Sequence, residues 1–509
     1  MFAYFALFSW PVVVFILFAR LKATDALIWS ILGGYLLLPV RTLYNPPILP
    51  TLDKSSVPAI AAMLAVAVWL GQQSKAVRTG AQGNGAQTFQ GSVILPGWLP
   101  GSTIMRILLL VLILGTFATV LNNSVPQIYG PKISRGLRPF DAFSDTLTAL
   151  TMLLPFFLGR KILAHPDAHK DILRIVCLAG LAYSLLALLE VRISPQLSKM
   201  LYGYHPGGWL QNLRGGGYRP TVFLAHGLFV GLFFSTAVLC ALGYKRLGYK
   251  RYLWAMLWLL MTLVLVKSLG ALIIALLLMP LVLIATPRMQ MLVSSIITIC
   301  FLSYPVLRTS GWVPVDALVS FAAKIDDRRA GSLSFRFENE DILLERAAQK
   351  PVFGWGGWSR SRVFDEKGRD ISITDGTWII KLGVGGWVKY ITEFGLLTLS
   401  VLLLTFRKRR YEVALSTSLL CVVLAGNLID LIPNSGLTPL SWLIAGALAG
   451  RLELTKAEIS QADEPDPVDK KTPGYSRPRP EHAPASARAH VPKARSEKQY
   501  SRTPVRPSQ

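Results

Sequence analysis

The sequence from Leu253 to Val266 reads LWAMLWLLMTLVLV, and four residues further on Ala271–Ala285 reads ALIIALLLMPLVLIA. Neither run contains a charged residue, and each approaches the roughly 20 residues that a helix needs to cross a bilayer. The runs Ile107–Val120 and Gly395–Phe406 have the same character. This repeated pattern predicts helices that lie in lipid.

The composition agrees with that interpretation and excludes a soluble globular protein. Of the 509 residues, 52% are hydrophobic and 16% charged, and the mean hydropathy is +0.44. The predicted fold class is an all-α polytopic membrane helix bundle of about 12–13 spans. The candidate spans are 2–19, 26–40, 57–71, 104–121, 140–158, 171–190, 220–243, 252–267, 269–286, 290–307, 386–405, 412–430 and 436–450.

The positive charge of the chain fixes an orientation. There are 53 Lys and Arg against 29 Asp and Glu, a net charge of +24. In a membrane protein such an excess marks cytoplasmic loops, so it does not predict nucleic acid as a partner. The basic loops at 245–251, 288 and 407–410 are therefore assigned to the cytoplasm, and counting spans places 191–218 and 308–385 on the extracytoplasmic side. The predicted location is a bacterial inner membrane.

Five regions follow from this count. Residues 1–103 hold the first spans and a Gly/Gln-rich cytoplasmic loop at 72–90, and 104–307 form the core bundle. Residues 308–385 form a long extracytoplasmic loop with short helices, and 386–456 hold the last spans. Residues 457–509 are a basic cytoplasmic tail of disordered composition. The tail either touches anionic lipid headgroups or a cytosolic partner, or is simply solvated.

The long loop is the first candidate for chemistry, because loops of this length are usually functional or disordered. It has a helical pattern from a predicted Ser334 cap to Gln349, then Pro351 and the turn Gly354-Trp355-Gly356-Gly357-Trp358. Arg346 on that helix, and Arg214 in the extracytoplasmic loop at 191–218, are secondary candidates for binding an anion.

The other extracytoplasmic loop holds Arg214, then Arg219 directly before a predicted span, with His226 seven residues later. Seven residues are two helical turns, so Arg219 and His226 are expected on one helix face. A histidine at membrane depth is expected to face the bundle interior, either in a hydrogen bond between helices or at a substrate site.

Three stretches resemble the O-antigen ligases and polysaccharide polymerases of bacterial envelopes. They are Arg219 with Ala225-His226-Gly227-Leu228, Ser334-Phe335-Arg336 followed by Pro351-Val352-Phe353-Gly354-Trp355-Gly356, and Thr374-Asp375-Gly376-Thr377-Trp378 with Glu393-Phe394-Gly395. Order and spacing carry the resemblance over residues 100–450.

The resemblance implies a GT-C-like, inverting membrane glycosyltransferase that takes its glycan from a polyprenyl-pyrophosphate carrier on the extracytoplasmic face. Two arginines that hold the pyrophosphate in this family match Arg219 and Arg336. The usual loop histidine is missing, and Asp375 stands in its place as the candidate base. That absence favours polymerase over ligase.

No cofactor or metal is predicted, since the two large extracytoplasmic loops contain no Asp-x-Asp pair. The expected partners are the lipid-linked glycan donor, a glycan or lipid-glycan acceptor, membrane lipids and other proteins of polysaccharide assembly. Two alternatives remain: a transporter or flippase of the same lipid-linked glycans, which paired discontinuous helices would favour, and a scaffold for envelope assembly.

Overall fold

The computed structural model describes residues 1–46, 50–77, 87–89, 92–208, 212–214, 216–324, 327–406 and 413–454. The loop at 72–90 lies largely, and the tail at 457–509 wholly, outside these residues. The α-helices are α1 Phe2–Arg20, α2 Ala23–Leu37, α3 Ser56–Val77, α4 Thr103–Leu121, α5 Pro139–Met152, α6 Leu154–Ile162, α7 Pro166–Ile193, α8 Leu197–Tyr202, α9 Gly227–Arg246, α10 Tyr252–Leu265, α11 Leu269–Leu283, α12 Pro287–Thr309, α13 Val315–Ala323, α14 Asp327–Ala348, α15 Thr377–Phe406, α16 Leu415–Leu431 and α17 Pro439–Arg451.

The strands are few and short. They form three antiparallel hairpins, β1 Gln87–Phe89 with β2 Ser92–Ile94, β3 Gln127–Tyr129 with β4 Lys132–Ser134, and β5 Leu213–Arg214 with β6 Gly217–Tyr218. All three lie in connections between helices. The prediction of an all-α fold is therefore confirmed.

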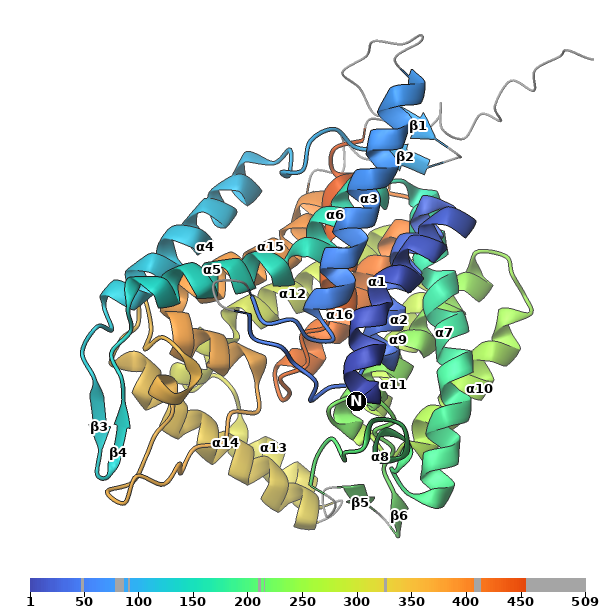
Figure 1. Cartoon of the computed structure of the whole chain (residues 1–509). Coiled ribbons are helices and arrows are strands. Elements are labelled where there is room, and N and C mark those ends of the chain that lie inside the picture. Colours follow the sequence, from blue (N-terminus) through green and yellow to red (C-terminus); the bar gives the residue numbers. More distant parts are fainter. Residues whose placement is uncertain are drawn as a thin grey trace, which may run out of the picture. The chain divides into compact units, whose positions relative to one another are not determined.

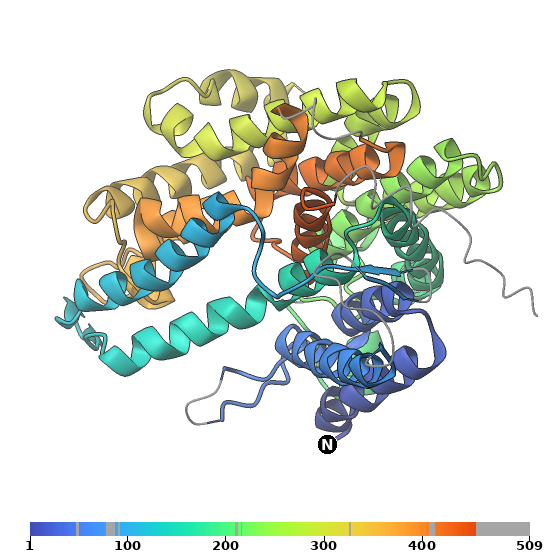
Figure 2. The same cartoon turned by 90° about the horizontal axis from the view of Figure 1, so that it is seen from above.

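Membrane character is confirmed as well. Within the described ranges, seven helices are long and apolar enough to cross a bilayer, and five shorter helices are apolar. The apolar stretch of α9 is 89% buried, whereas that of α1 is 17% buried. Thus α9 forms the centre of the bundle, in contact with α7, α10, α11 and α16, and α1 packs with α2 and α3 at one side (Figure 2).

One end of the bundle carries most of the extra structure. It holds α8, α13, α14 and the hairpins β3–β4 and β5–β6, and is called the loop-rich end below (Figure 1). The start of α1 belongs to it, since the Phe2 ring stacks on Tyr202 of α8 with centroids 6.2 Å apart. The turn between α1 and α2 therefore lies at the opposite end.

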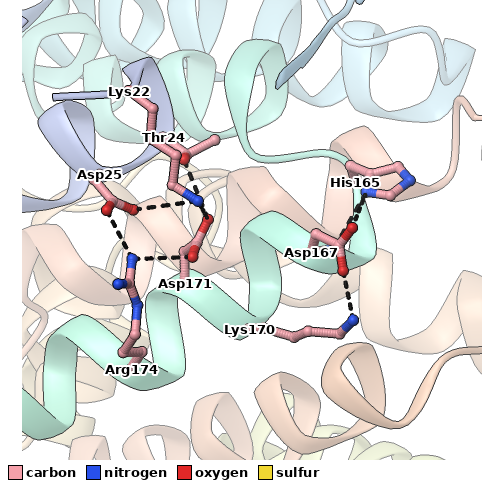
Figure 3. Close-up of polar contacts among 8 residues, drawn as sticks. All are labelled: Lys22, Thr24, Asp25, His165, Asp167, Lys170, Asp171 and Arg174. Carbon is pink, nitrogen blue, oxygen red and sulfur yellow. Dashed lines mark hydrogen bonds and ion pairs between the residues drawn. The ribbon is translucent and has the colours of Figure 1, made fainter. Parts of the chain in front are cut away.

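That opposite end is fastened by a network of charges called the α1–α7 network, made of Lys22, Asp25, Asp171 and Arg174 (Figure 3). Lys22 Nζ lies 2.7 Å from Asp171 Oδ2, and Arg174 Nη2 lies 2.7 Å from Asp25 Oδ2. Arg174 also reaches Asp171 at 3.1 Å, and Lys22 reaches Asp25 at 3.8 Å. Each charge thus meets both opposite charges, and the network ties the α1–α2 turn to the first turns of α7.

Three predicted boundaries are wrong. Helix α9 begins at Gly227 rather than 220, so Arg219 and His226 do not share a helix face. Ser334 is no cap, because α14 already begins at Asp327 and the Ser334 hydroxyl donates to Glu338 Oε1 within the helix at 2.8 Å. The long loop ends at Thr377 rather than 385, because α15 begins there.

Candidate functional site

Arg219 lies on an irregular segment, residues 219–226, that is buried from 219 to 224, turns at 222–223 and leads into α9. Val222 has φ +49°, which is strained for a β-branched residue. The strain is held by the fully buried Glu190, whose Oε2 accepts hydrogen bonds from the backbone N–H groups of Thr221 and Val222 at 2.9 and 2.7 Å. These backbone groups are satisfied by a side chain instead of a helix, which explains why the span starts late.

The Arg219 guanidinium is buried beside the first turn of α9. Its side chain is 4% exposed, and Nη2 donates to the hydroxyl of Ser268 at 3.1 Å. Gly227 makes room for it, since a Cβ there would lie 2.7 Å from the Arg219 Cγ and Cδ atoms. The glycine of the Ala225-His226-Gly227-Leu228 stretch is thus required by the arginine.

Arg336 and Asp375 meet directly. The Nε atom of Arg336, on α14, lies 3.2 Å from Oδ2 of Asp375, which precedes the start of α15 by two residues. The two side chains keep 30% and 41% of their surface exposed. Two predicted residues from different motifs therefore form one ion pair open to solvent.

Asp430, near the end of α16, connects this pair to Arg219. It is 4% exposed, its Oδ1 accepts a hydrogen bond from Asn434 Nδ2 at 2.8 Å, and both Arg336 and Arg219 act on it electrostatically. Arg219, Arg336, Asp375 and Asp430 are called the arginine–aspartate cluster below. They come from four separate segments, and sequence reasoning missed Asp430 although an acid near the end of an apolar run is a signal for function.

A further cation approaches the same segment. Lys54, between α2 and α3, is 8% exposed and its Nζ donates to the carbonyl of Phe223 at 2.7 Å. Burial lowers the pKa of Lys54 to about 7. Lys54 and Glu190 together hold the backbone that carries Arg219.

The Gly/Trp turn after α14 has a structural role. Helix α15 is interrupted at Gly386, which has φ +63°. The N–H groups of Trp355 and Gly356 donate to the carbonyls of Gly383 and Val384, at 2.9 and 2.8 Å. On the other side of the break, the N–H groups of Trp387 and Val388 donate to Pro351 and Val352 at 2.8 and 3.2 Å. The turn thus fills the break, satisfies its backbone groups and fixes the first half of α15, before which Asp375 lies.

A buried carboxylate lies one turn along α14 from Arg336. Glu340 is 8% exposed, and its Oε2 lies 3.5 Å from Arg308 Nε and 3.4 Å from the Tyr304 hydroxyl. Burial raises the pKa of Glu340 to about 7, against the opposing effect of Arg308. Its neighbour Asp341 is bound by Arg308 Nη2 at 2.6 Å.

The structure places the remaining predicted residues elsewhere or in other roles. His226 is the N-cap of α9, and its Nδ1 accepts a hydrogen bond from the Leu228 N–H at 3.1 Å. It therefore lies at the start of the helix and not within it. Arg346 lies ten residues along α14 from Arg336, and its Cζ is 3.3 Å from the centre of the Trp355 ring. The Arg214 side chain lies outside the described part of the chain.

Comparison with known proteins adds no identity: no protein-family model and no curated protein matches this chain. The fold and its apolar helices define the class, a polytopic all-α membrane protein. Any narrower function has to be argued from the cluster itself.

Proposed function

We propose that this protein is an inverting glycosyltransferase of the O-antigen ligase and polysaccharide polymerase type. It transfers a glycan from a polyprenyl-pyrophosphate carrier to an acceptor hydroxyl on the extracytoplasmic face of a bacterial inner membrane. The observation that carries the proposal is the ion pair of Arg336 with Asp375 together with the electrostatic effect of both Arg219 and Arg336 on Asp430, which links three motifs spread over more than 150 residues.

Two guanidinium groups suit a pyrophosphate leaving group. Negative charge develops on its oxygens as the bond to the sugar breaks, and guanidinium forks stabilise phosphate oxygens through paired N–H donors. Arg219 is held by Ser268 and by its buried backbone, so its donors are positioned before the donor substrate arrives. Arg336 is the more exposed of the two and is paired with Asp375, the candidate base.

Asp375 serves as the base in this scheme. Its carboxylate takes the proton of the acceptor hydroxyl, the acceptor oxygen bonds to the anomeric carbon, and the bond from that carbon to the pyrophosphate oxygen breaks with inversion. Before substrate binds, Asp375 is paired with Arg336. A bound pyrophosphate competes for that guanidinium, so donor binding frees the carboxylate for its reaction.

The broken helix α15 bears on the alternative of a glycan transporter. Within the described ranges, α15 is the helix with a non-helical residue inside, and its break is filled by the 351–356 turn through four backbone hydrogen bonds. Alternating access would require a break that can move, paired with a second one. The filled break supports the enzyme.

The proposed orientation in the membrane rests on which helix ends lie together at each end of the bundle. Arg219, Asp375 and Asp430 lie at helix ends that share the loop-rich end with α14 (Figure 1). Basic loops at the other helix ends assign the loop-rich end to the extracytoplasmic side. Single cysteines at Ser359 and Arg288, in a Cys300→Ser background because Cys300 is exposed, should react with an impermeant maleimide from opposite sides. Reaction from one side for both contradicts the orientation.

The deciding experiment uses purified full-length protein with a polyprenyl-pyrophosphate-linked repeat unit. Longer lipid-linked chains identify a polymerase, and transfer only to a second acceptor identifies a ligase. Asp375→Asn should lower turnover with little change in donor binding, because the amide keeps the shape and loses the base. Movement of lipid-linked glycan across vesicles with no new glycosidic bond would replace the enzyme by a transporter.

A further inference from the structure

A second group of cations lies at the far end of α14, around Trp355. Arg346 stacks on the ring face with Cζ at 3.3 Å from its centre, and Lys350 Nζ lies 4.7 Å from the same centre. Arg360, from the short 3-10 helix at Trp358–Ser361, donates from Nε to the Trp355 carbonyl at 3.1 Å. Arg346, Lys350 and Arg360 are called the Trp355 cation cluster below.

None of the three cations meets a carboxylate among the described residues. Arg360 is 2% exposed, so its charge is buried. The partners of the cluster are carbonyl, hydroxyl and amide oxygens: for Arg360 the carbonyls of Trp355, Arg135 and Val125, for Arg346 the Tyr129 hydroxyl, the Arg360 carbonyl and Gln349, and for Lys350 the Asn122 carbonyl and Asn123.

These like charges repel one another. The pKa of Lys350 is lowered by burial and then by Arg360 and Arg346. The pKa of Arg346 is lowered by burial, with Arg360 opposing its charge as well. Neutral acceptors compensate a buried guanidinium only in part, so the fold maintains an excess of positive charge that an anion would relieve.

A pocket of about 640 Å³ opens next to this cluster. Its wall includes Lys132, Arg135, Arg360, Arg362 and Phe364, from the β3–β4 hairpin and the 357–370 loop, with Asp370 as the carboxylate of the lining. Asp370 is bound by Arg362, and Arg135 is paired with Asp141 at 2.8 Å. Lys132, whose Nζ lies 3.7 Å above the Phe364 ring, keeps its charge for a ligand, and the buried guanidinium of Arg360 adds positive charge to the wall.

We propose that this pocket binds an anionic glycan, a saccharide chain with carboxylates on its sugars. The cationic side chains of Lys132 and of Arg135, which is 66% exposed, suit carboxylates, the volume is that of an ordinary ligand pocket, and Phe364 adds an apolar surface for a sugar. That the ligand is a glycan rests on the proposed function; that it is an anion rests on the charges alone.

The position of the pocket fits an acceptor or product chain better than a lipid headgroup. It is built from a hairpin and a loop at the loop-rich end, where β3, β4 and α14 extend beyond the packed helices (Figure 1). Ten residues of α14 separate Arg336 from Arg346, about 15 Å at the rise of an α-helix. A chain that reacts at the arginine–aspartate cluster can therefore reach the pocket with sugars further along.

Binding to the full-length protein tests this without any turnover. Isothermal titration with tetragalacturonate should show binding that weakens with salt, whereas a neutral galactose tetramer should not bind. The double variant Lys132→Gln, Arg135→Gln should bind tetragalacturonate at least tenfold more weakly. The matched control Arg369→Gln, at an exposed arginine outside the pocket lining, should bind as the unchanged protein does.

Other outcomes overturn the assignment. Equal binding of the neutral tetramer removes the charge from recognition, and full affinity in the double variant places the site elsewhere. Pyrophosphate or phosphatidylglycerol vesicles that displace tetragalacturonate from the unchanged protein would make the ligand a phosphate or a headgroup. Arg219→Lys should leave this binding unchanged, so loss of glycosyl transfer in that variant and loss of tetragalacturonate binding report on the two proposals separately.

Discussion

The two ends of the bundle each hold a group of two cations and two aspartates, and the two groups are arranged differently. The α1–α7 network and the arginine–aspartate cluster each combine two cations with two aspartates from segments far apart in sequence. In the network, four cation–carboxylate contacts of 2.7 to 3.8 Å pair every charge twice. In the cluster, Arg336 and Asp375 are paired at 3.2 Å, and both arginines act electrostatically on the buried Asp430.

This difference indicates that the α1–α7 network stabilises the fold and that the arginine–aspartate cluster is a candidate binding site. In the closed set each cation lies beside both carboxylates, and the contribution of the set is to hold the α1–α2 turn and α2 against α7 (Figure 3). An open set keeps its components apart on four segments, and its arginines can turn their donors to a ligand. The Trp355 cation cluster goes further, since its cations lack carboxylate partners within the described residues.

The largest expected effect comes from replacing the guanidinium groups of the cluster. Arg219→Lys and Arg336→Lys keep the charge but lose the planar fork, and loss of one positioned donor to a developing anion costs on the order of 3 kcal/mol, about a hundredfold in turnover. Arg174→Lys in the α1–α7 network is the matched control and should change turnover less than twofold. Glycan transfer with purified proteins is the measurement, and normal turnover in both cluster variants removes the pyrophosphate role.

The second test concerns the helices that carry the two groups of charges, one of which is continuous and the other interrupted. The network is carried on the unbroken α7, whereas Asp375 precedes a helix interrupted at Gly386. In Gly386→Ala the new Cβ would have a positive φ and lie 2.4 Å from the Val352 carbonyl, which should cost about 2 kcal/mol of stability. Gly357→Ala, where the added Cβ meets nothing within 4 Å, is the control. A thermal midpoint that falls equally in both variants would contradict a specific need for glycine at the break in α15.

A smaller effect is expected within the network. Asp171→Asn removes the charge that Lys22 and Arg174 share, and because these side chains are partly exposed the cost should be about 1 kcal/mol and should shrink in high salt. Glycan transfer per folded molecule should stay unchanged. A loss of transfer at normal stability would mean that the closed network takes part in function, and the contrast between the two ends would then fail.

The smallest effect is a pH dependence at Glu340. Its folded-state pKa of about 7 lies above the ordinary glutamate value of 4.5, so the folded protein holds a proton that the unfolded chain has released between these values. This contribution to stability is complete below pH 4.5 and is lost as pH rises through 7. The thermal midpoint of Glu340→Gln should therefore fall less between pH 5 and pH 8 than that of the unchanged protein. Parallel curves would show that Glu340 stays ionised.

The motifs pointed to three of the four residues of the arginine–aspartate cluster. Arg219, Arg336 and Asp375 could be named from the sequence because they lie in the three stretches that carry the family resemblance, whereas Asp430 lies inside a predicted span. For Arg346 and Arg360, the fold gives the side chains surroundings that the sequence did not indicate. The sequence marked Arg346 as a candidate for binding an anion, but the fold stacks it on Trp355, and it buries Arg360 of the same long loop.

What the sequence determined by itself is the class of the protein, because transfer of apolar runs out of water is a property of local composition and needs no partner segment. It also determined most helix positions to within a few residues. Only the tertiary structure decided where a helix begins late or is interrupted. The Glu190 carboxylate accepts hydrogen bonds from the backbone N–H groups of Thr221 and Val222, so these residues are not part of α9, and the 351–356 turn binds the backbone on both sides of the break at Gly386 in α15. Which charges pair with one another was decided at the same level, since the contacts of Lys22 with Asp171, of Arg174 with Asp25 and of Arg336 with Asp375 join residues that lie tens to more than a hundred positions apart in the sequence.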